Sequence, residues 1–141
     1  MIIMPLLDSE AFENLLMALE EIRELSSKGV AIIVEGESDE KSLRELEVTG
    51  PVYQVPKDGK TSLNSLEDLS GREEVIILTD FDRTGEDLAD FCKEHLEMLG
   101  VEVLSLQRQK LKNVVRKAVK DIEGLASFVR SERVSHEGYS S

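Results

Sequence analysis

Cysteine is almost absent from this 141-residue sequence, which contains Cys92 and no other. A single cysteine excludes a disulfide within the chain and fits a reducing compartment. No apolar stretch approaches the length needed to cross a membrane, and residues 1–7 are apolar but lack the Lys or Arg that begins a secretory signal. We therefore expect a cytoplasmic protein with no membrane partner.

Stretches rich in Pro, Gly and Ser are also missing, so no linker divides the chain. Its length suits one hydrophobic core, and its 40% apolar and 33% charged residues are typical of a globular protein rather than a disordered one. We expect a single domain over residues 1–141.

Basic residues are scarce, with 17 Lys and Arg against 29 Asp and Glu, and the net charge of −12 argues against a general nucleic-acid coating protein. The charges are unevenly distributed, because residues 108–120 contain six basic side chains and no acid. This run predicts a local basic patch. The alternative is an amphipathic helix over Leu111, Val114, Val115 and Ala118 whose basic face is merely solvated.

Two apolar, β-branched runs each end in acidic residues and a glycine. Residues 75–78 are followed by Thr79, Asp80, Phe81 and Asp82, and residues 30–34 by Glu35 and Gly36. Because the carboxyl ends of parallel strands lie at one edge of a sheet, the three carboxylates should converge there, where they repel one another unless a cation such as Mg²⁺ binds. The alternative is a solvated turn in which an Asp merely caps the next helix.

Strands alternate with helices along the chain. We expect an α/β fold with strands at 30–34, 52–55, 75–78 and 101–104 in a mainly parallel, Rossmann-like sheet of order 2-1-3-4, covered by helices on both faces. A first helix spans residues 8–27, Ser38 caps a second, and Thr61 or Ser62 begins a third. The C-terminal helical extension spans 106–134, ending in a short helix from Leu125, and residues 135–141 should fray.

The motifs Val34-Glu35-Gly36 and Thr79-Asp80-Phe81-Asp82-Arg83-Thr84-Gly85 resemble those of the Toprim domain, over about residues 28–105. The chain length and the tail around residues 120–125 are most similar to small stand-alone Toprim proteins of archaea. The resemblance implies that Glu35 is a general acid/base or a metal ligand, and that Asp80 and Asp82 bind Mg²⁺, with Mn²⁺ as a substitute. Asp39 is then an auxiliary acid.

The activity implied by this resemblance is Mg²⁺-dependent hydrolysis or transfer of a phosphodiester in RNA or DNA. Such chemistry needs cations that position phosphate, and the candidates are Lys57, Arg83, Arg108 and Lys112. The sequence contains no P-loop and no cysteine cluster, and neither Tyr53 nor Tyr139 is accompanied by a further domain. These absences argue against topoisomerase and self-sufficient primase activity.

Two other functions fit the same residues. Asp80-Phe81-Asp82-Arg83-Thr84 also matches the opening motif of haloacid-dehalogenase phosphatases, although here it follows the third strand instead of the first and no second acidic pair follows. A non-catalytic module, in which a metal site organises a nucleic-acid or protein partner, is the second alternative. A protein partner could supply specificity, and the apolar first helix could pair two copies of the chain.

Overall fold

The computed structural model describes residues 4–55, 64–115 and 117–139. Its centre is a four-stranded sheet in which every neighbouring pair is parallel, and the order is β2-β1-β3-β4. The predicted order 2-1-3-4 is therefore confirmed. The strands are β1 (Ala31–Val34), β2 (Val52–Gln54), β3 (Glu74–Ile77) and β4 (Glu102–Leu104).

Two helical layers cover the sheet because β1 and β3 are apolar on both faces. Ile32 and Val34 pack on one face with residues of α1, α2, α5 and α6, whereas Ala31 and Ile33 pack on the other with α4 and the helical residues 64–67. Successive strand residues point to opposite faces, so a run of four buried residues needs cover on both sides. Cys92 lies in the second of these clusters and is buried, so it packs in the core.

The structure corrects three of the predictions about the helices. They are α1 (Ser9–Ser27), α2 (Glu37–Glu45), α4 (Arg83–Met98), α5 (Leu106–Val115) and α6 (Leu125–Tyr139). Ser38 does not cap α2, since Gly36 occupies the cap position and Asp39 accepts its N–H. Ala118 lies beyond the end of α5, and α6 continues through residues 135–139, where fraying was expected. The predicted start at Thr61 or Ser62 lies outside the described residues.

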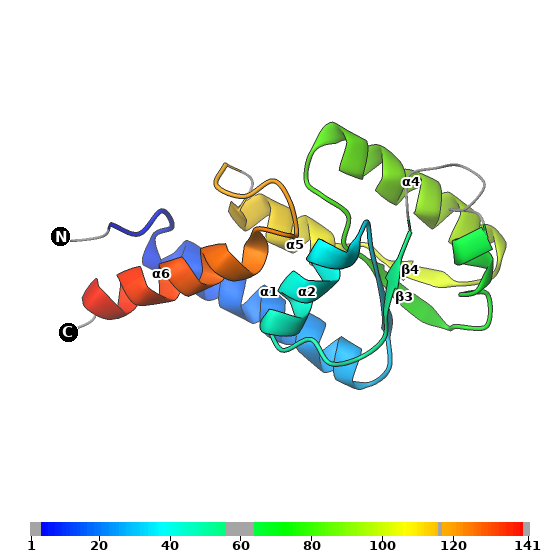
Figure 1. Cartoon of the computed structure of the whole chain (residues 1–141), viewed down its shortest axis with the longest axis horizontal. Helices are drawn as coiled ribbons and strands as arrows, with labels where there is room; N and C mark the ends of the chain where they lie inside the picture. The colour runs from blue at the N-terminus through cyan, green and yellow to red at the C-terminus, as the bar shows by residue number, and fades with distance from the viewer. Residues whose placement is uncertain (1–3, 56–63, 116, 140–141) are drawn as a thin grey trace.

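Figure 1 shows α4 on one side of the sheet and α1, α2, α5 and α6 on the other. α1 and α6 extend beyond the sheet, and both chain termini lie at this end of the molecule. In the described ranges, no helix is both long enough and apolar enough to cross a membrane.

A buried carboxylate joins α6 to the residues that precede α1. Glu132 is 2% exposed, and its two oxygens accept the backbone N–H groups of Leu6, at 3.1 Å, and Leu7, at 2.7 Å. One turn further along α6, the ring of His136 stacks on Phe12 with 4.2 Å between centroids. These contacts fasten the last helix to the N-terminal residues.

We predict that Glu132→Ala lowers the free energy of unfolding by about 1.5–3 kcal/mol, because the backbone N–H groups of Leu6 and Leu7 lose a buried, charged acceptor. Urea unfolding followed by circular dichroism measures this change. Glu137→Ala, which removes an exposed carboxylate from the same helix, should change the stability by less than about 0.5 kcal/mol. Equal effects of the two substitutions would show that the Glu132 contacts contribute nothing.

Candidate functional site

The acid-bearing turn follows β3 directly and opens α4. Thr79 is buried and its hydroxyl donates to the Gly85 carbonyl at 2.7 Å, while Asp82 caps α4 by accepting the Gly85 N–H at 2.7 Å. A Cβ at Gly85 would lie 1.9 Å from the Asp80 carbonyl oxygen, so the turn requires glycine there. Asp82 thus has the capping role that the sequence left open, and this role engages one carboxylate oxygen.

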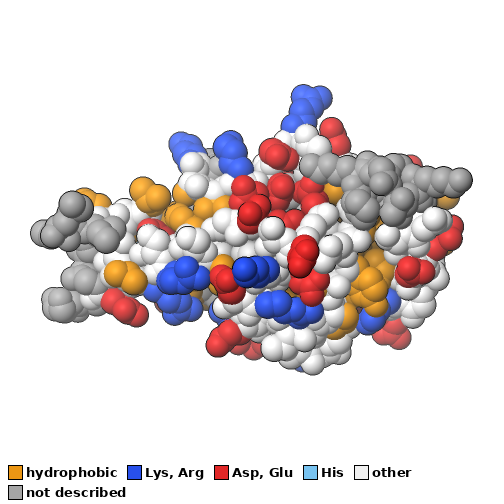
Figure 2. Space-filling model, in the orientation of Figure 1, with side chains coloured by type: hydrophobic (Ala, Val, Ile, Leu, Met, Phe, Trp, Pro, Cys, Tyr) orange, Lys and Arg blue, Asp and Glu red, His pale blue; other side chains and the backbone are white. Residues whose placement is uncertain are grey.

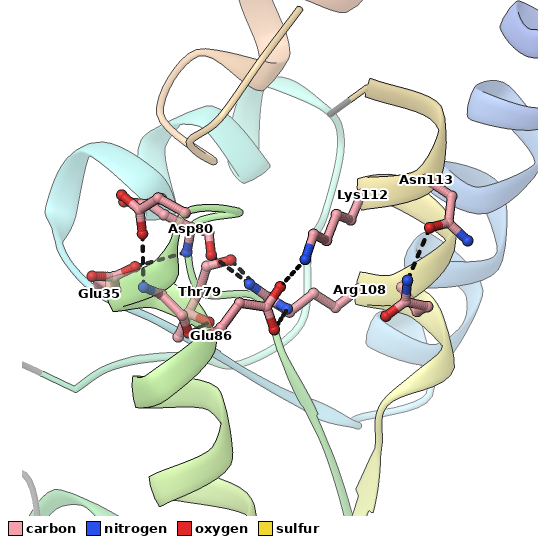
Figure 3. A network of polar contacts seen from close by, with 10 residues as sticks. Glu35, Thr79, Asp80, Glu86, Arg108, Lys112 and Asn113 are labelled. Carbon is pink, nitrogen blue, oxygen red and sulfur yellow. Dashed lines mark hydrogen bonds and ion pairs between the residues drawn. The ribbon is translucent and has the colours of Figure 1, made fainter. Parts of the chain in front are cut away.

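Glu35 and Asp80 meet across the neighbouring strands β1 and β3. Oε2 of Glu35 accepts the backbone N–H of Asp80 at 2.7 Å, and Figure 3 shows the two residues side by side at the end of the sheet. Asp39, in the first turn of α2, is 7% exposed and its Oδ2 accepts the Gly36 N–H at 3.1 Å. The parallel register therefore brings together the acids predicted from two separate motifs.

The chain after α5 returns to this edge, which sequence reasoning did not predict. We call residues 119–124 the crossing segment. The Phe81 N–H donates to the Lys120 carbonyl at 2.7 Å, and the N–H of the buried Ile122 donates to Oδ1 of Asp80 at 3.1 Å. Figure 3 shows this part of the chain, in pale orange, coming down beside Asp80. A buried apolar residue between two acids, Asp121 and Glu123, is the signal that could have revealed it.

The carboxyl groups at this edge of the sheet lie close together, and the pKa values of two of them are raised. Burial raises the pKa of Asp80 to about 6, and the negative charges of Glu35, Asp39 and Asp121 add to that shift, while the Ile122 N–H opposes it. Burial also raises the pKa of Asp39, with further contributions from Glu35 and Glu123. We call Glu35, Asp39, Asp80, Asp82, Asp121 and Glu123 the acidic edge. Figure 2 shows Asp and Glu side chains gathered in the middle of this face, between α5 and α2.

The chemistry of the acidic edge fits a hard divalent cation, since all of its side-chain donors are carboxylate oxygens. Oδ2 of Asp80 and Oδ2 of Asp82 have no hydrogen-bond partner among the described residues. In the same part of the chain, however, no three Asp, Glu, His or Cys side chains form a group that could hold a metal ion. The carboxylate oxygens are therefore the right type of ligand for a divalent cation, but several of them accept hydrogen bonds from backbone N–H groups in this structure.

The predicted phosphate-binding residues lie in different surroundings. Arg108 is 6% exposed, its Nε donates to the Thr79 carbonyl at 3.1 Å, another guanidinium nitrogen donates to the Asp80 carbonyl, and a third pairs with Glu86 at 3.0 Å. Lys112 also pairs with Glu86 (Figure 3). Arg83 is exposed as the first residue of α4, and Lys57 lies outside the described residues. Arg108 thus connects α5 to the turn, and its contact with phosphate stays a prediction.

Ion pairs with acidic residues neutralise part of the positive charge of the predicted basic patch. Although burial opposes the change, hydrogen bonds from Lys112 and Arg108 lower the pKa of Glu86. Lys110 pairs with Glu21 of α1 at 2.9 Å. Three of the basic side chains of residues 108–120 therefore hold α5 against α4 and α1, while Lys117 and Lys120 are exposed.

Arg108→Met should lower the free energy of unfolding by about 2–3 kcal/mol, because two carbonyls at the turn and Glu86 lose a charged donor. Lys110→Met, which removes an exposed ion pair from the same helix, should cost less than about 1 kcal/mol. Chemical unfolding of both variants beside the wild type measures the difference. A cost for Arg108→Met no larger than that for Lys110→Met would contradict the anchoring role.

The stability of the metal-free protein should depend on the ionisation of Asp80. Its folded pKa of about 6 is above the ordinary 3.8, so the stability contributed by the protonated form is complete below about pH 4 and is lost as the pH rises through 6. Asp80→Asn should therefore be more stable than the wild type by about 1 kcal/mol at pH 8 after allowance for partial exposure, and equally stable near pH 4.

Thermal unfolding in EDTA between pH 4 and pH 8 tests this dependence. Asp87→Asn, at an exposed position of α4, should show no such pH-dependent difference. A destabilised Asp80→Asn protein at pH 8 would mean that the hydrogen bond to Ile122 outweighs the repulsion.

Comparison with known proteins agrees with this geometry. The chain is 36% identical to a UPF0292 protein of Methanosarcina acetivorans, over 88% of this chain and 83% of that protein, and 36% identical to one of Methanocaldococcus jannaschii, over 85% and 93%. A solved structure of a protein from Aquifex aeolicus superposes with a TM-score of 0.62 and 29% identity, covering 76% of this chain and 94% of that one. Toprim domains are associated with nucleic acid and generally bind Mg²⁺ through acidic residues. The Toprim domain model matches residues 30–122, from the start of β1 to the buried Ile122, and the chain therefore belongs to the Toprim domain family.

Proposed function

We propose that this protein is a Mg²⁺-dependent enzyme that hydrolyses or transfers phosphodiesters in nucleic acid. The observation that carries the proposal is the contact between Glu35 and Asp80, which brings the acids of two separate motifs to one edge of the sheet. Burial raises the pKa of Asp80 to about 6, and the charges of Glu35, Asp39 and Asp121 add to the shift. A structural role alone does not explain this arrangement, because burying and crowding carboxylates costs stability. Groups that repel in this way are typical of sites that bind cations.

In this proposal Asp80 and Asp82 hold Mg²⁺, or Mn²⁺ in its place. The bound cation would neutralise negative charge on the phosphate oxygens. Glu35 is the general acid/base or a further ligand, and its hydrogen bond to the Asp80 N–H fixes its carboxylate at the end of β1. Asp39 is the auxiliary acid, since the raised pKa of this carboxyl favours its protonated form.

Substrate phosphates need cations at the rim of the site. Arg83 is the best placed of the predicted residues, because it is exposed and follows Asp82 directly. Lys57 is proposed on its sequence position alone, and Lys112 and Arg108 would have to exchange their contacts with Glu86 for phosphate. The proposed setting is the cytoplasm, and RNA and DNA are both retained as substrates. A protein partner and pairing of two copies through the first helix are retained as further proposals.

A non-catalytic binding module is the second candidate. The observation in its favour is that the described residues contain no group of three acids ready to hold a metal ion. In that case the acidic edge would organise a partner in a metal-dependent way without cleaving it.

A cleavage assay separates the two candidates. End-labelled structured RNA, single-stranded DNA and nicked duplex would be incubated with Mg²⁺, Mn²⁺ or EDTA. We expect metal-dependent cleavage of at least one substrate, reduced at least 100-fold by Asp80→Asn and by Glu35→Gln, since each change removes a charged group from the site. Asp87→Asn, which removes an exposed acid of α4, should cleave like the wild type.

Circular dichroism would establish that each variant folds. Metal-dependent binding of a substrate without cleavage, lost in Asp80→Asn, would favour the binding module. Cleavage that persists in EDTA or in both variants would overturn the proposed enzyme.

A further inference from the structure

The crossing segment brings a basic side chain to the acidic edge. The Lys120 carbonyl accepts the Phe81 N–H at 2.7 Å, which places Lys120 beside the turn that contains Asp80 and Asp82. Two residues on, Ile122 is buried and its N–H donates to Asp80, so the backbone is held on both sides of Asp121. The position of Lys120 is therefore fixed by the same turn that carries the acids.

Lys120 differs from most basic residues near the site because it forms no ion pair with a described residue. Arg108 and Lys112 pair with Glu86, and Lys110 pairs with Glu21. Lys120 is exposed, and among residues 4–55, 64–115 and 117–139 no acid lies within ion-pair distance of it. The carboxylate of its neighbour Asp121 is engaged with the backbone, since Oδ1 accepts the Gly124 N–H at 2.7 Å.

Arg83, which follows Asp82 directly, has the same character. It is exposed, it has no ion pair with any described residue, and it adjoins Asp82 as Lys120 adjoins Asp121. Two cations on separate segments thus each adjoin a carboxylate in sequence without pairing with it. Figure 2 shows Lys and Arg side chains beside the gathered acids on this face.

We propose that Lys120 binds a phosphate of the nucleic-acid strand, so that the crossing segment contributes to the substrate-binding surface together with Arg83. This inference rests on the proposed function and extends it to a residue outside both sequence motifs. A polyanion is repelled by the acidic edge and by a net charge of −12, and local cations offset that repulsion where the strand must approach. Lysine suits this role because its ammonium group contacts phosphate as a point charge.

Binding, measured apart from cleavage, tests the inference. Fluorescence anisotropy would follow a 20-nucleotide single-stranded RNA and a matching DNA bound to the Glu35→Gln protein in Mg²⁺, at several salt concentrations. We expect Lys120→Ala to weaken binding about 5- to 10-fold and to reduce the slope of log K against log salt by about 1. Lys120→Arg should restore most of the affinity, because it restores the charge.

Lys28→Ala is the matched control, since Lys28 is an exposed lysine at the amino end of the strands, away from the acidic edge. It should bind within 2-fold of the parent protein. Thermal unfolding of Lys120→Ala should match the parent, whereas a lysine that only balances the acidic edge would change the melting temperature and leave the salt slope unaltered.

Unchanged affinity and slope in Lys120→Ala would overturn the inference. Equal losses in Lys120→Ala and Lys28→Ala, or no binding of either strand by the parent protein, would overturn it as well. A different result would contradict the proposed enzymatic function alone. In that case binding would depend on Lys120, but the wild type would cleave none of the substrates.

Discussion

The architecture of the site depends on hydrogen bonding of the backbone just beyond β3. Residues 79–81 leave the sheet while they are still buried or half-buried, and a buried backbone group without a partner costs as much as a lost hydrogen bond. Arg108 donates to the Thr79 and Asp80 carbonyls, Glu35 accepts the Asp80 N–H, and the Lys120 carbonyl accepts the Phe81 N–H. One short turn thus fixes β1, α5 and the crossing segment around Asp80.

The same contacts explain how a crowded group of carboxylates can persist. Each of Glu35, Asp39, Asp80 and Asp82 accepts a backbone N–H, and such bonds stabilise the ionised form. Burial and mutual repulsion act in the opposite direction, and for Asp80 they prevail, since its pKa rises to about 6. The fold tolerates this cost because the turn is held by contacts to Arg108 that do not depend on the charge of Asp80.

The sequence was a good guide to the strands and to the two motifs. Runs of β-branched residues fix the strands, and the parallel order follows from their alternation with helices, so the amino-acid pattern alone placed Glu35 and Asp80 together. Arg108 could not be distinguished from a solvated cation, because the sign of a charge in a run does not reveal which side chain is buried. The crossing segment was missed because it contains neither a strand nor a helix, so no periodic pattern indicated that its backbone contacts the turn after β3. The exact ends of α2 and α6 depended on caps and on tertiary packing, which periodicity does not record.

The helices outside the Toprim match, α1 and α6, support the site by packing and contribute no residue to the acidic edge. α1 lies before residue 30 and α6 after residue 122, and both contribute to the cluster that covers one face of the sheet. The Ala126 N–H donates to the Ser42 hydroxyl of α2, and Glu132 fastens α6 to Leu6 and Leu7. Because the crossing segment leads directly into α6, these contacts hold its C-terminal end. The C-terminal helix therefore stabilises the position of Ile122, whose N–H in turn holds the Asp80 carboxylate at the acidic edge.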